Sequence, residues 1–352
     1  MIKYLRLLLL PFSLIYGIVV ILRNKFYDWG LLRSARFDIP VICVGNLVVG
    51  GSGKSPVTEY LVHLLAGYKI AILSRGYGRD TRGFLYADAA ATAKTIGDEP
   101  LQFYHKFPGV TVAVCEDRVY GIQQLKDGHD LILLDDAFQH RSVRPGFSIL
   151  LFEFQKLLQP QFILPAGNMR EPFSGYQRAD VVLITKAPET VSALQKDTCT
   201  GKFNAGTAEK LFFSTIRYGE LTGLFTKEVS DLEILRSKTV FLLTGIANPQ
   251  PLLEELNKYT SAIVHHDYPD HHSFSRQNLS KLVEAFLHHP AKEKIILTTE
   301  KDAQRLFDDT FKELLLNLPV FYLPIKIVIQ TDRKEAFNQT ILKYVSDTSR
   351  NR

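Results

Sequence analysis

The sequence predicts an α/β protein with a doubly wound, mainly parallel β-sheet, a second and smaller α/β domain, and an N-terminal membrane-associated helix. Three observations support this prediction. Almost continuously apolar runs alternate with helix-like segments, a glycine-rich loop follows the first run, and a long apolar stretch stands near the N-terminus. Apolar runs without alternation are typical of parallel strands, because helices cover both faces of such a sheet.

The 352 residues divide into four segments on this basis. Residues 1–36 form the apolar N-terminal segment, 37–211 the first domain, 212–345 the smaller domain and 346–352 a polar tail. After the run that begins at residue 39, the expected strands of the first domain are 70–73, 110–114, 131–134, 148–152 and 180–184. The smaller domain is expected to contain strands at 239–244 and 294–298 and a helix at 249–259.

The composition excludes several classes of protein. Hydrophobic residues make up 46% of the chain and charged residues 22%, which is ordinary for a folded protein and excludes general disorder. Three scattered cysteines argue for a reducing compartment and against a disulfide framework. The net charge of +5 suits an anionic surface or substrate, but no basic repeat or RNA-binding signature indicates nucleic acid.

The stretch 7–22 is almost wholly apolar. As a helix it would reach about 24 Å, less than the roughly 30 Å of a hydrocarbon core, and Pro11 would end or kink its first part. A secretory signal and a single membrane span are the alternatives. Flanking cations and aromatics favour a helix held at the membrane surface, on its cytoplasmic face. These flanking residues are Lys3, Arg6, Arg23, Lys25, Arg33 and Arg36, with Phe26, Tyr27 and Trp29.

A glycine-rich loop follows the run that begins at Ile39 and leads into a helix-like segment. Glycines let backbone N–H groups wrap around phosphate oxygens. Lys54 would bring its charge to the β- and γ-phosphates of a nucleotide, and Ser55 a hydroxyl to Mg²⁺. Val48 stands where the usual loop has its first glycine. The domain is therefore P-loop NTPase-like, and the residues expected to hold the nucleotide are Gly50, Gly51, Ser52, Gly53, Lys54 and Ser55.

Asp135 and Asp136 directly follow the apolar run 131–134. A carboxylate at the C-terminal end of a buried parallel strand can hold Mg²⁺ or its waters opposite a phosphate loop. Paired aspartates are also common in solvated turns. The prediction of a metal site therefore depends on the phosphate loop in the same sheet.

Asp98 lies in the segment Gly-Asp-Glu-Pro at 97–100. It is a candidate general base, a carboxylate that orients a hydroxyl and takes its proton during phosphoryl transfer. Asp before Glu and Pro is also an ordinary helix start. The local sequence alone favours the helix N-cap over the base.

A loop rich in Gly and Pro carries Arg170 and Glu171. Arg170 could bind phosphate through its planar guanidinium group, and Glu171 could join the metal site. A surface ion pair explains the two residues equally well.

Residues 265–272 concentrate histidines and aspartates in one loop. Neither companion cysteines nor H-E-x-x-H spacing supports zinc. A histidine held by a neighbouring carboxylate and acting in proton transfer is the favoured interpretation. Solvated loop histidines are the alternative, especially for His265, His266, His288 and His289.

Together these segments resemble one family, the tetraacyldisaccharide 4′-kinases of lipid A biosynthesis. The resemblance extends from the apolar N-terminus to about Leu306. It rests on ordered motifs at 44–56, 73–78, 97–100, 135–141, 165–172, 244–249, 270–272 and 299–302. The family's variant loop also has an aliphatic lead-in, so Val48 fits the resemblance.

The resemblance implies transfer of the γ-phosphate of ATP to the 4′-hydroxyl of an acylated glucosamine disaccharide 1-phosphate, which gives lipid IVA. ATP and Mg²⁺ would be the cofactors, and the enzyme would work among inner-membrane lipids on the cytoplasmic face of the bacterial inner membrane. By motif, Asp98 becomes the acceptor-orienting base, supported by Asp270 and His271 across the two domains. The other implied roles are catalysis for Lys54, phosphate or substrate contacts for Arg75, His140 and Arg170, and metal contacts for Ser55, Asp135, Asp136 and Glu171.

Other classes compete with a kinase. A GTPase switch is suggested by Thr185 and Lys186, but Pro188 stands where guanine recognition needs an aspartate. A partitioning-type ATPase would hydrolyse nucleotide without an acceptor. A lipid-binding protein without activity would leave Lys54, Asp98 and the paired aspartates without a task.

Overall fold

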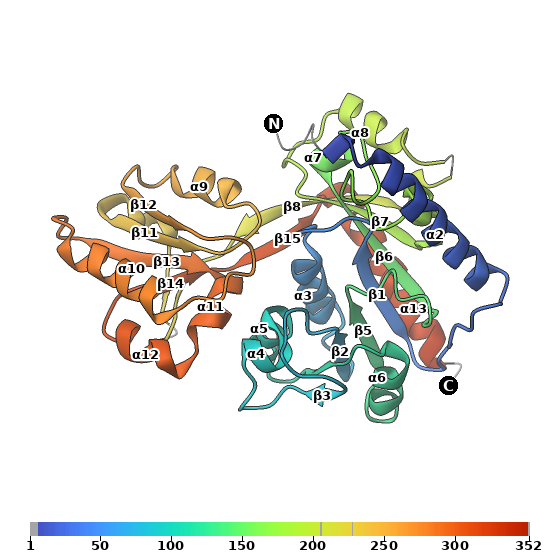
Figure 1. Ribbon diagram of the computed structural model, residues 1–352, viewed down its shortest axis with the longest axis horizontal. Helices are drawn as coiled ribbons and strands as arrows, with labels where there is room; N and C mark the ends of the chain where they lie inside the picture. Colours follow the sequence, from blue (N-terminus) through green and yellow to red (C-terminus); the bar gives the residue numbers. More distant parts are fainter. Residues whose placement is uncertain (1–5, 205, 227, 351–352) are drawn as a thin grey trace.

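The computed structural model describes residues 6–204, 206–226 and 228–350, which form two lobes (Figure 1). Within these residues the larger lobe is built on a sheet in the order β15-β8-β7-β6-β1-β5-β2-β4-β3. β3 and β15 pair antiparallel with their neighbours, and the strands between them are parallel. The strands are β1 (Val41–Asn46), β2 (Ile70–Ser74), β3 (Leu85–Tyr86), β4 (Thr111–Val114), β5 (Leu131–Asp135), β6 (Phe147–Glu153), β7 (Val181–Thr185), β8 (Leu211–Tyr218) and β15 (Ile325–Ile329).

Helices cover both faces of this sheet, which confirms the doubly wound α/β fold. On one face α3, α5 and α13 bury Leu61, Phe103 and Phe337 against the strands. On the other face α6 and α7 bury Ile122 and Phe154. The helices of the larger lobe after the N-terminal one are α3 (Lys54–Leu64), α4 (Ala93–Ile96), α5 (Asp98–Lys106), α6 (Arg118–Leu125), α7 (Phe154–Leu157), α8 (Ala193–Thr200) and α13 (Thr331–Arg350).

The register places the ends of the two central strands side by side. Val44 of β1 lies opposite Asp135 of β5, and both strands are fully buried. Ligands of doubly wound sheets bind beyond the carboxyl ends of such strands. The phosphate loop after β1 and the paired aspartates after β5 are therefore brought to one edge of the sheet.

The smaller lobe has its own sheet, in the order β10-β9-β14-β13-β11-β12. The expected strands at 239–244 and 294–298 are present, and the expected helix at 249–259 is shorter, Gln250–Leu256. Its strands are β9 (Leu221–Gly223), β10 (Val229–Ser230), β11 (Thr239–Thr244), β12 (Ile263–Asp267), β13 (Lys294–Thr299) and β14 (Val320–Leu323). Its helices are α9 (Gln250–Leu256), α10 (Arg276–His288), α11 (Glu300–Leu306) and α12 (Asp309–Leu315).

The two lobes divide the chain differently from the expected boundary at residue 211. β8 pairs parallel with β7 in the larger sheet, and β15 pairs with β8, so that these two strands carry the chain out to the smaller lobe and back (Figure 1). α13 then packs on the larger sheet through Phe337, Ile341 and Val345. The smaller lobe is thus an insertion between β8 and β15, and a linear reading of apolar runs does not reveal where a strand pairs. The expected polar tail is helical as far as Arg350, and residues 351–352 lie outside the described residues.

The N-terminal helix α2 (Leu10–Asp28) lies on the outer side of the larger lobe (Figure 1). It begins just before Pro11, and turn geometry at residues 8–9 separates it from the preceding helical residues, as expected of proline. The side of α2 that packs against the larger lobe is narrow. Ser13, Gly17 and Val20 are buried there, and the Ser13 hydroxyl donates to the carbonyl of Ile163. Lys3, one of the expected flanking cations, lies outside the described residues.

The other sides of α2 expose apolar residues. Leu14 and Ile18 are 69% and 57% exposed, and the helix is long and apolar enough to cross a membrane by length and composition. An isolated apolar face of this kind, beside the exposed Trp29, is unusual for a monomeric soluble surface.

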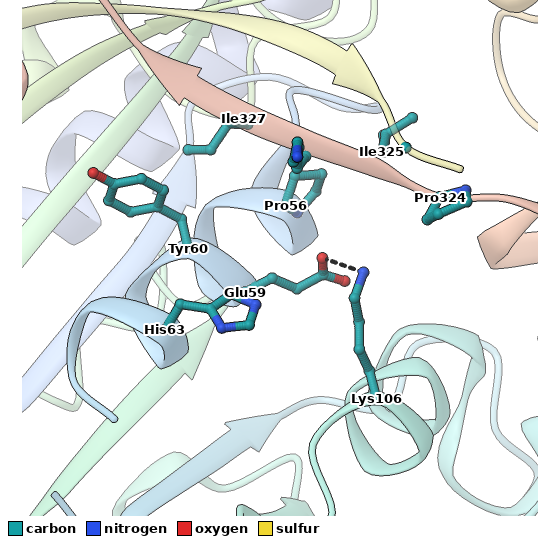
Figure 2. Close-up of a pocket in the computed structure, with 10 residues that line it drawn as sticks. Pro56, Glu59, Tyr60, His63, Lys106, Pro324, Ile325 and Ile327 are labelled. Atoms are coloured by element: carbon teal, nitrogen blue, oxygen red, sulfur yellow. Dashed lines mark hydrogen bonds and ion pairs between the residues drawn. The ribbon is translucent and has the colours of Figure 1, made fainter. Parts of the chain in front are cut away.

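A cavity of about 310 Å³ lies where α3, α5 and the crossing strands meet (Figure 2). Glu59 of α3 and Lys106 of α5 form an ion pair of 2.8 Å at its edge, and Lys106 lies equally close to Glu300 of α11 in the smaller lobe. One ammonium group thus joins two largely buried carboxylates across the lobes. Burial and the nearby Glu59 carboxylate raise the pKa of Glu300 to about 7, although Lys106 opposes this shift.

This buried cluster predicts a pH-dependent stability. A carboxyl group whose pKa is higher in the folded state binds its proton more tightly there, so its stabilising contribution is complete below about pH 4.5 and is lost as the pH rises through about 7. Replacing Glu300 by Gln should reduce the loss of unfolding free energy between pH 5 and pH 8 by roughly 1–3 kcal/mol. Urea unfolding at both pH values measures it.

Glu313→Gln is the matched control, because Glu313 pairs with Arg276 at the surface of the same lobe. Its pH dependence should equal that of the unchanged protein. An unaltered pH dependence in Glu300→Gln would contradict the interpretation.

Candidate active site

The phosphate loop has the geometry that the sequence predicts. β1 ends at Asn46, and α3 begins at Lys54 after Gly53. Gly53 adopts φ +84°, a left-handed conformation that other residues adopt only with strain. A Cβ atom at Gly50 or Gly51 would meet no atom within 4 Å, so open space lies over the loop. The loop can therefore present its N–H groups and the α3 N-terminus to an anion.

Three side chains that frame the loop were not predicted in this role. The Asn46 amide donates to the Ser52 hydroxyl at 2.7 Å, and the Thr185 hydroxyl donates to the Ser52 carbonyl at 2.8 Å. The Lys186 ammonium group donates to the Gly51 carbonyl at 2.6 Å. Thr185 and Lys186, which the sequence offered as guanine recognition, thus hold the loop from the end of β7.

Val48 has a structural reason for not being glycine. Its backbone forms an antiparallel bridge with Met169, and its side chain is buried in the core of the larger lobe. The next hydrogen bonds, Val49 N–H to Asn168 and Arg170 N–H to Leu47, join the phosphate loop to the loop of Arg170. An extended, apolar residue suits this bridge better than glycine.

The paired aspartates have different surroundings. Asp135 is fully buried, and its Oδ1 has no hydrogen-bond partner among the described residues. Burial, followed by the charge of Glu99, raises the pKa of Asp135 to about 7, although Lys54 and Arg118 oppose this shift. Asp136 is partly exposed, in a left-handed conformation with φ +50°.

Two predicted cations converge on Asp136. Lys54 lies 3.7 Å from its carboxylate, and Arg170 lies 3.2 Å from it. The structure therefore brings the phosphate-loop lysine, the second aspartate and the arginine of the following loop together. This is the arrangement of charges expected around nucleotide phosphates.

Arg75 and His140 lie at the edge of the same group. Arg75 is exposed after β2, and its charge acts on both His140 and the buried Arg118. Burial and the charge of Arg118 lower the pKa of His140, so its imidazole is mainly neutral at pH 7. The His140 Nε2 atom accepts a hydrogen bond of 3.4 Å from the Arg118 backbone N–H.

Asp98 begins α5 but does not cap it. The N-cap is Gly97, with φ +94°, and the favoured local interpretation of Asp98 as the cap is therefore wrong. Its side chain instead reaches the smaller lobe, where Arg305 Nε donates to Oδ2 at 2.8 Å and His271 Nδ1 lies 3.2 Å from the same oxygen. Burial opposes ionisation, but hydrogen bonds from His271 and Arg305 outweigh it and hold the pKa of Asp98 at about 2.

His271 of the smaller lobe lies between the Asp98 carboxylate of the larger lobe and the Lys301 ammonium group. It has φ +58°, its Nε2 lies 3.2 Å from the Lys301 ammonium group, and its ring centre lies 5.3 Å from that of Tyr77. Asp270 approaches Nε2 only to 4.0 Å and forms no hydrogen bond with it. The structure thus joins Asp98 and His271 across the two lobes, as expected, whereas Asp270 lies at the margin of the pair.

Two of the remaining histidines of this loop have other partners. The His265 ring lies 2.8 Å from the Thr244 hydroxyl, and the His272 ring stacks on Tyr268. Burial and the neighbouring His265 lower the pKa of His266. The loop therefore sends a single histidine, His271, to the carboxylate of the larger lobe.

The structure does not support Glu171 as a metal ligand. Glu171 is fully buried, and Arg178 Nη2 donates to both of its oxygens at 2.9 Å. The Asn24 amide of α2 and the Gln139 amide donate at 3.0 and 3.1 Å. Because four hydrogen bonds already satisfy the carboxylate, its role in this geometry is to fix α2 against the site loops.

A central parallel strand that ends in a phosphate loop, with carboxylates after its neighbour, defines the P-loop class of nucleotide-dependent enzymes. Within that class, the family model of the tetraacyldisaccharide-1-P 4′-kinase, LpxK, matches residues 5–346. The chain belongs to this family, and its activity is that of a tetraacyldisaccharide 4′-kinase in lipid A biosynthesis.

Individual relatives agree over nearly the whole chain. The tetraacyldisaccharide 4′-kinase of Bacteroides thetaiotaomicron is 44% identical over 97% of this chain and 94% of its own length. That of Phocaeicola vulgatus is 42% identical over 97% and 96%. The crystal structure of LpxK from Aquifex aeolicus in complex with ATP is 29% identical, with a TM-score of 0.76 over 97% of this chain and 99% of that one.

Two cations of the site were missed from the sequence, Lys301 and Arg305. Both lie on α11, four residues apart and thus on one face of the helix, and they contact His271 and Asp98. The motif at 299–302 signalled that this segment matters. It gave no sign that the helix faces a carboxylate of the other lobe.

The contacts of Glu171 predict the result of Glu171→Gln. This change leaves Arg178 without its ion-pair partner, and breaking a buried pair destabilises proteins by about 3–5 kcal/mol. Urea unfolding should show this loss, whereas calorimetry should find Mg²⁺-dependent nucleotide affinity unchanged. Lost affinity with unaltered stability would instead make Glu171 a metal ligand.

Proposed function

We propose that ATP, with Mg²⁺, is the phosphoryl donor and that Asp98 is the base for the 4′-hydroxyl of the lipid acceptor. The observation that carries this proposal is the position of the Asp98 carboxylate, which stands at the start of α5 in the larger lobe and is held by Arg305 and His271 of the smaller lobe. Its neighbour Glu99 acts electrostatically on Asp135 at the end of β5, which supports a short separation between the two parts of the site.

The phosphate contacts follow from the charges at the sheet edge. The loop N–H groups and Lys54 bind the β- and γ-phosphates, and Arg170 neutralises the transferred group. In the structure Lys54 and Arg170 are both paired with Asp136. Anionic phosphates would compete with that carboxylate for the two cations. The complex of the Aquifex aeolicus relative with ATP agrees with this donor.

Phosphoryl transfer exchanges one bond to the γ-phosphorus for another. The 4′-oxygen forms a bond to the γ-phosphorus while the bond from this phosphorus to the β-phosphate oxygen breaks, and ADP leaves. Because the pKa of Asp98 is about 2, it cannot remove the hydroxyl proton in advance. It accepts the proton as the new bond forms and the hydroxyl becomes strongly acidic, which suits the loose transition state of phosphoryl transfer.

The residues at the end of β5 fit Mg²⁺. Asp135 Oδ1 is a buried oxygen without a hydrogen bond, and its neighbourhood does not hold enough positive charge to keep its pKa low. Asp135 and the Ser55 hydroxyl would hold the cation, with Asp136 nearby. Among the described residues no three His, Cys, Asp or Glu side chains gather as a metal site. Mg²⁺ suits this, since it keeps waters and phosphate oxygens as ligands and would neutralise charge on the transferred group.

α2 would hold the enzyme at the membrane that contains its acceptor. Its exposed apolar residues would enter the acyl region, while Arg23, Lys25 and Arg33 would lie near anionic headgroups. The family's tetraacylated substrate supports this position, because its acyl chains remain in the bilayer. We place the protein on the cytoplasmic face of the inner membrane, where ATP is present.

The proposed roles predict a graded loss of transfer. With [γ-³²P]ATP, Mg²⁺ and tetraacyldisaccharide 1-phosphate in mixed micelles, the unchanged protein should label the lipid. Asp98→Ala should lower kcat by about 10²–10⁴-fold because it removes the base. Lys54→Ala should lose about 10²-fold or more through lost charge at the phosphates, and His271→Ala should lose less than either. ATP hydrolysis without labelled lipid would refute the proposal.

The proposed anchor predicts that charges on α2 weaken membrane binding. Leu14→Asp with Ile18→Asp places two carboxylates on the exposed face, which should sharply reduce co-sedimentation with anionic vesicles without altering thermal unfolding. Leu194→Asp on α8 is the control, because Leu194 is 76% exposed on another surface. Equal vesicle binding by all three proteins would show that α2 is not the anchor.

A further inference from the structure

We propose that Arg305 is a positioning residue that fixes the Asp98 carboxylate by one oxygen and anchors it to the smaller lobe. The inference rests on the proposed role of Asp98 as the base. It is drawn from the contacts of a buried guanidinium group that lies on the opposite lobe from the carboxylate it holds.

Arg305 uses its two edges for different partners. On one edge, Nε and Nη2 both donate to Asp98 Oδ2. On the other edge, Nη1 donates to Asp302 Oδ1 at 2.8 Å and to the carbonyls of Gly245 and His272 at 3.3 Å. Arg305 is 8% exposed and Asp302 is fully buried, so buried contacts within the smaller lobe hold the guanidinium group in place.

All the hydrogen bonds that the structure gives the Asp98 carboxylate from the described residues end on Oδ2. Arg305 and His271 supply them, and Oδ1 accepts none. Three donors on one oxygen restrict the movement of the carboxylate and leave the other oxygen available for a hydroxyl. A base held in this way presents one oxygen to the hydroxyl in a restricted orientation. Such positioning governs the rate of proton transfer.

The hydrogen-bond partners of Arg305 in the smaller lobe also explain how the site depends on both lobes. Asp302 is held by the Gly245 N–H at 3.0 Å and by the Thr299 hydroxyl at 2.7 Å. The Gly245 carbonyl in turn accepts from the His271 N–H. One small network therefore sets both groups that contact Asp98, so that a displaced smaller lobe would release the carboxylate from both at once.

A double-mutant cycle with Asp98 distinguishes a positioning role of Arg305 from a purely structural role. Arg305→Gln should lower kcat by about 100-fold or more and leave KM for ATP unchanged, because ATP binds on the larger lobe. Asp98→Asn should lower kcat at least as much. If Arg305 acts through Asp98, the double variant should be no slower than Asp98→Asn alone, since residues that act as one unit are non-additive.

The pH profile gives an independent readout. The titratable groups that act on Asp98 are His271, Lys301 and Arg305 from the smaller lobe, and Lys301 also pairs with Glu99 of α5. Burial raises the pKa of Asp98, and Arg305 opposes that effect. Without Arg305 the pKa of Asp98 should therefore rise, and the acid limb of the profile of kcat against pH should move to higher pH.

Arg305→Lys and Arg276→Gln complete the design. Lysine keeps the charge but loses the planar pair of donors, so Arg305→Lys should recover part of kcat. It replaces Gln in the cycle if Arg305→Gln does not fold. Arg276→Gln, at an exposed arginine of the same lobe, should behave like the unchanged protein.

The role of Arg305 would be overturned if the losses of kcat in the two single variants multiply in the double variant. It would also be overturned if the acid limb of the profile of kcat against pH does not move in the Arg305 variant. An Asp98→Asn variant with full kcat would instead overturn the proposed base and leave the contacts of Arg305 structural.

Discussion

The ion pair between Asp98 and Arg305 is the contact on which the arrangement of the site depends. The two residues belong to different lobes, and the chain between the lobes crosses only through β8 and β15 in the described residues. Two extended strands can bend without breaking core packing, so they do not by themselves fix where a side chain of the smaller lobe lies. Charged contacts of α11 provide that restraint: Arg305 with Asp98, Lys301 with Glu99 and Glu300 with Lys106.

A second set of contacts ties the other end of the site to α2. Glu171 receives hydrogen bonds from Asn24 of the helix, from Gln139 and from Arg178. Gln139 also accepts from Arg170, which pairs with Asp136 beside Lys54. The helix that would enter the membrane is thus continuous, through side-chain hydrogen bonds, with the charges around the phosphate loop. A lipid acceptor and a soluble nucleotide would meet between these two tethers.

Elements with strong local patterns could be predicted from the sequence. The strand at 239–244 has the expected bounds, and the phosphate loop follows β1 as its glycines and Lys54 indicate. The pairing of β8 and β15, which makes the smaller lobe an insertion, could not be predicted because strand partners are set by tertiary packing. For the same reason the cap interpretation of Asp98 was wrong. A short sequence window shows how a helix begins, but not that an arginine more than 200 residues away binds its first carboxylate.

Two carboxylates of the site have different pKa values because their environments differ. Asp98 and Asp135 are both largely removed from water, yet the pKa of Asp98 is about 2 and that of Asp135 about 7. The difference is in their partners: Asp98 has a guanidinium group and an imidazole in hydrogen-bond contact, whereas Asp135 has Glu99 nearby and an oxygen without a hydrogen bond. The protein's own cations keep Asp98 ionised before any ligand binds. Asp135 lacks that compensation, and its environment suits a cation that arrives with the nucleotide.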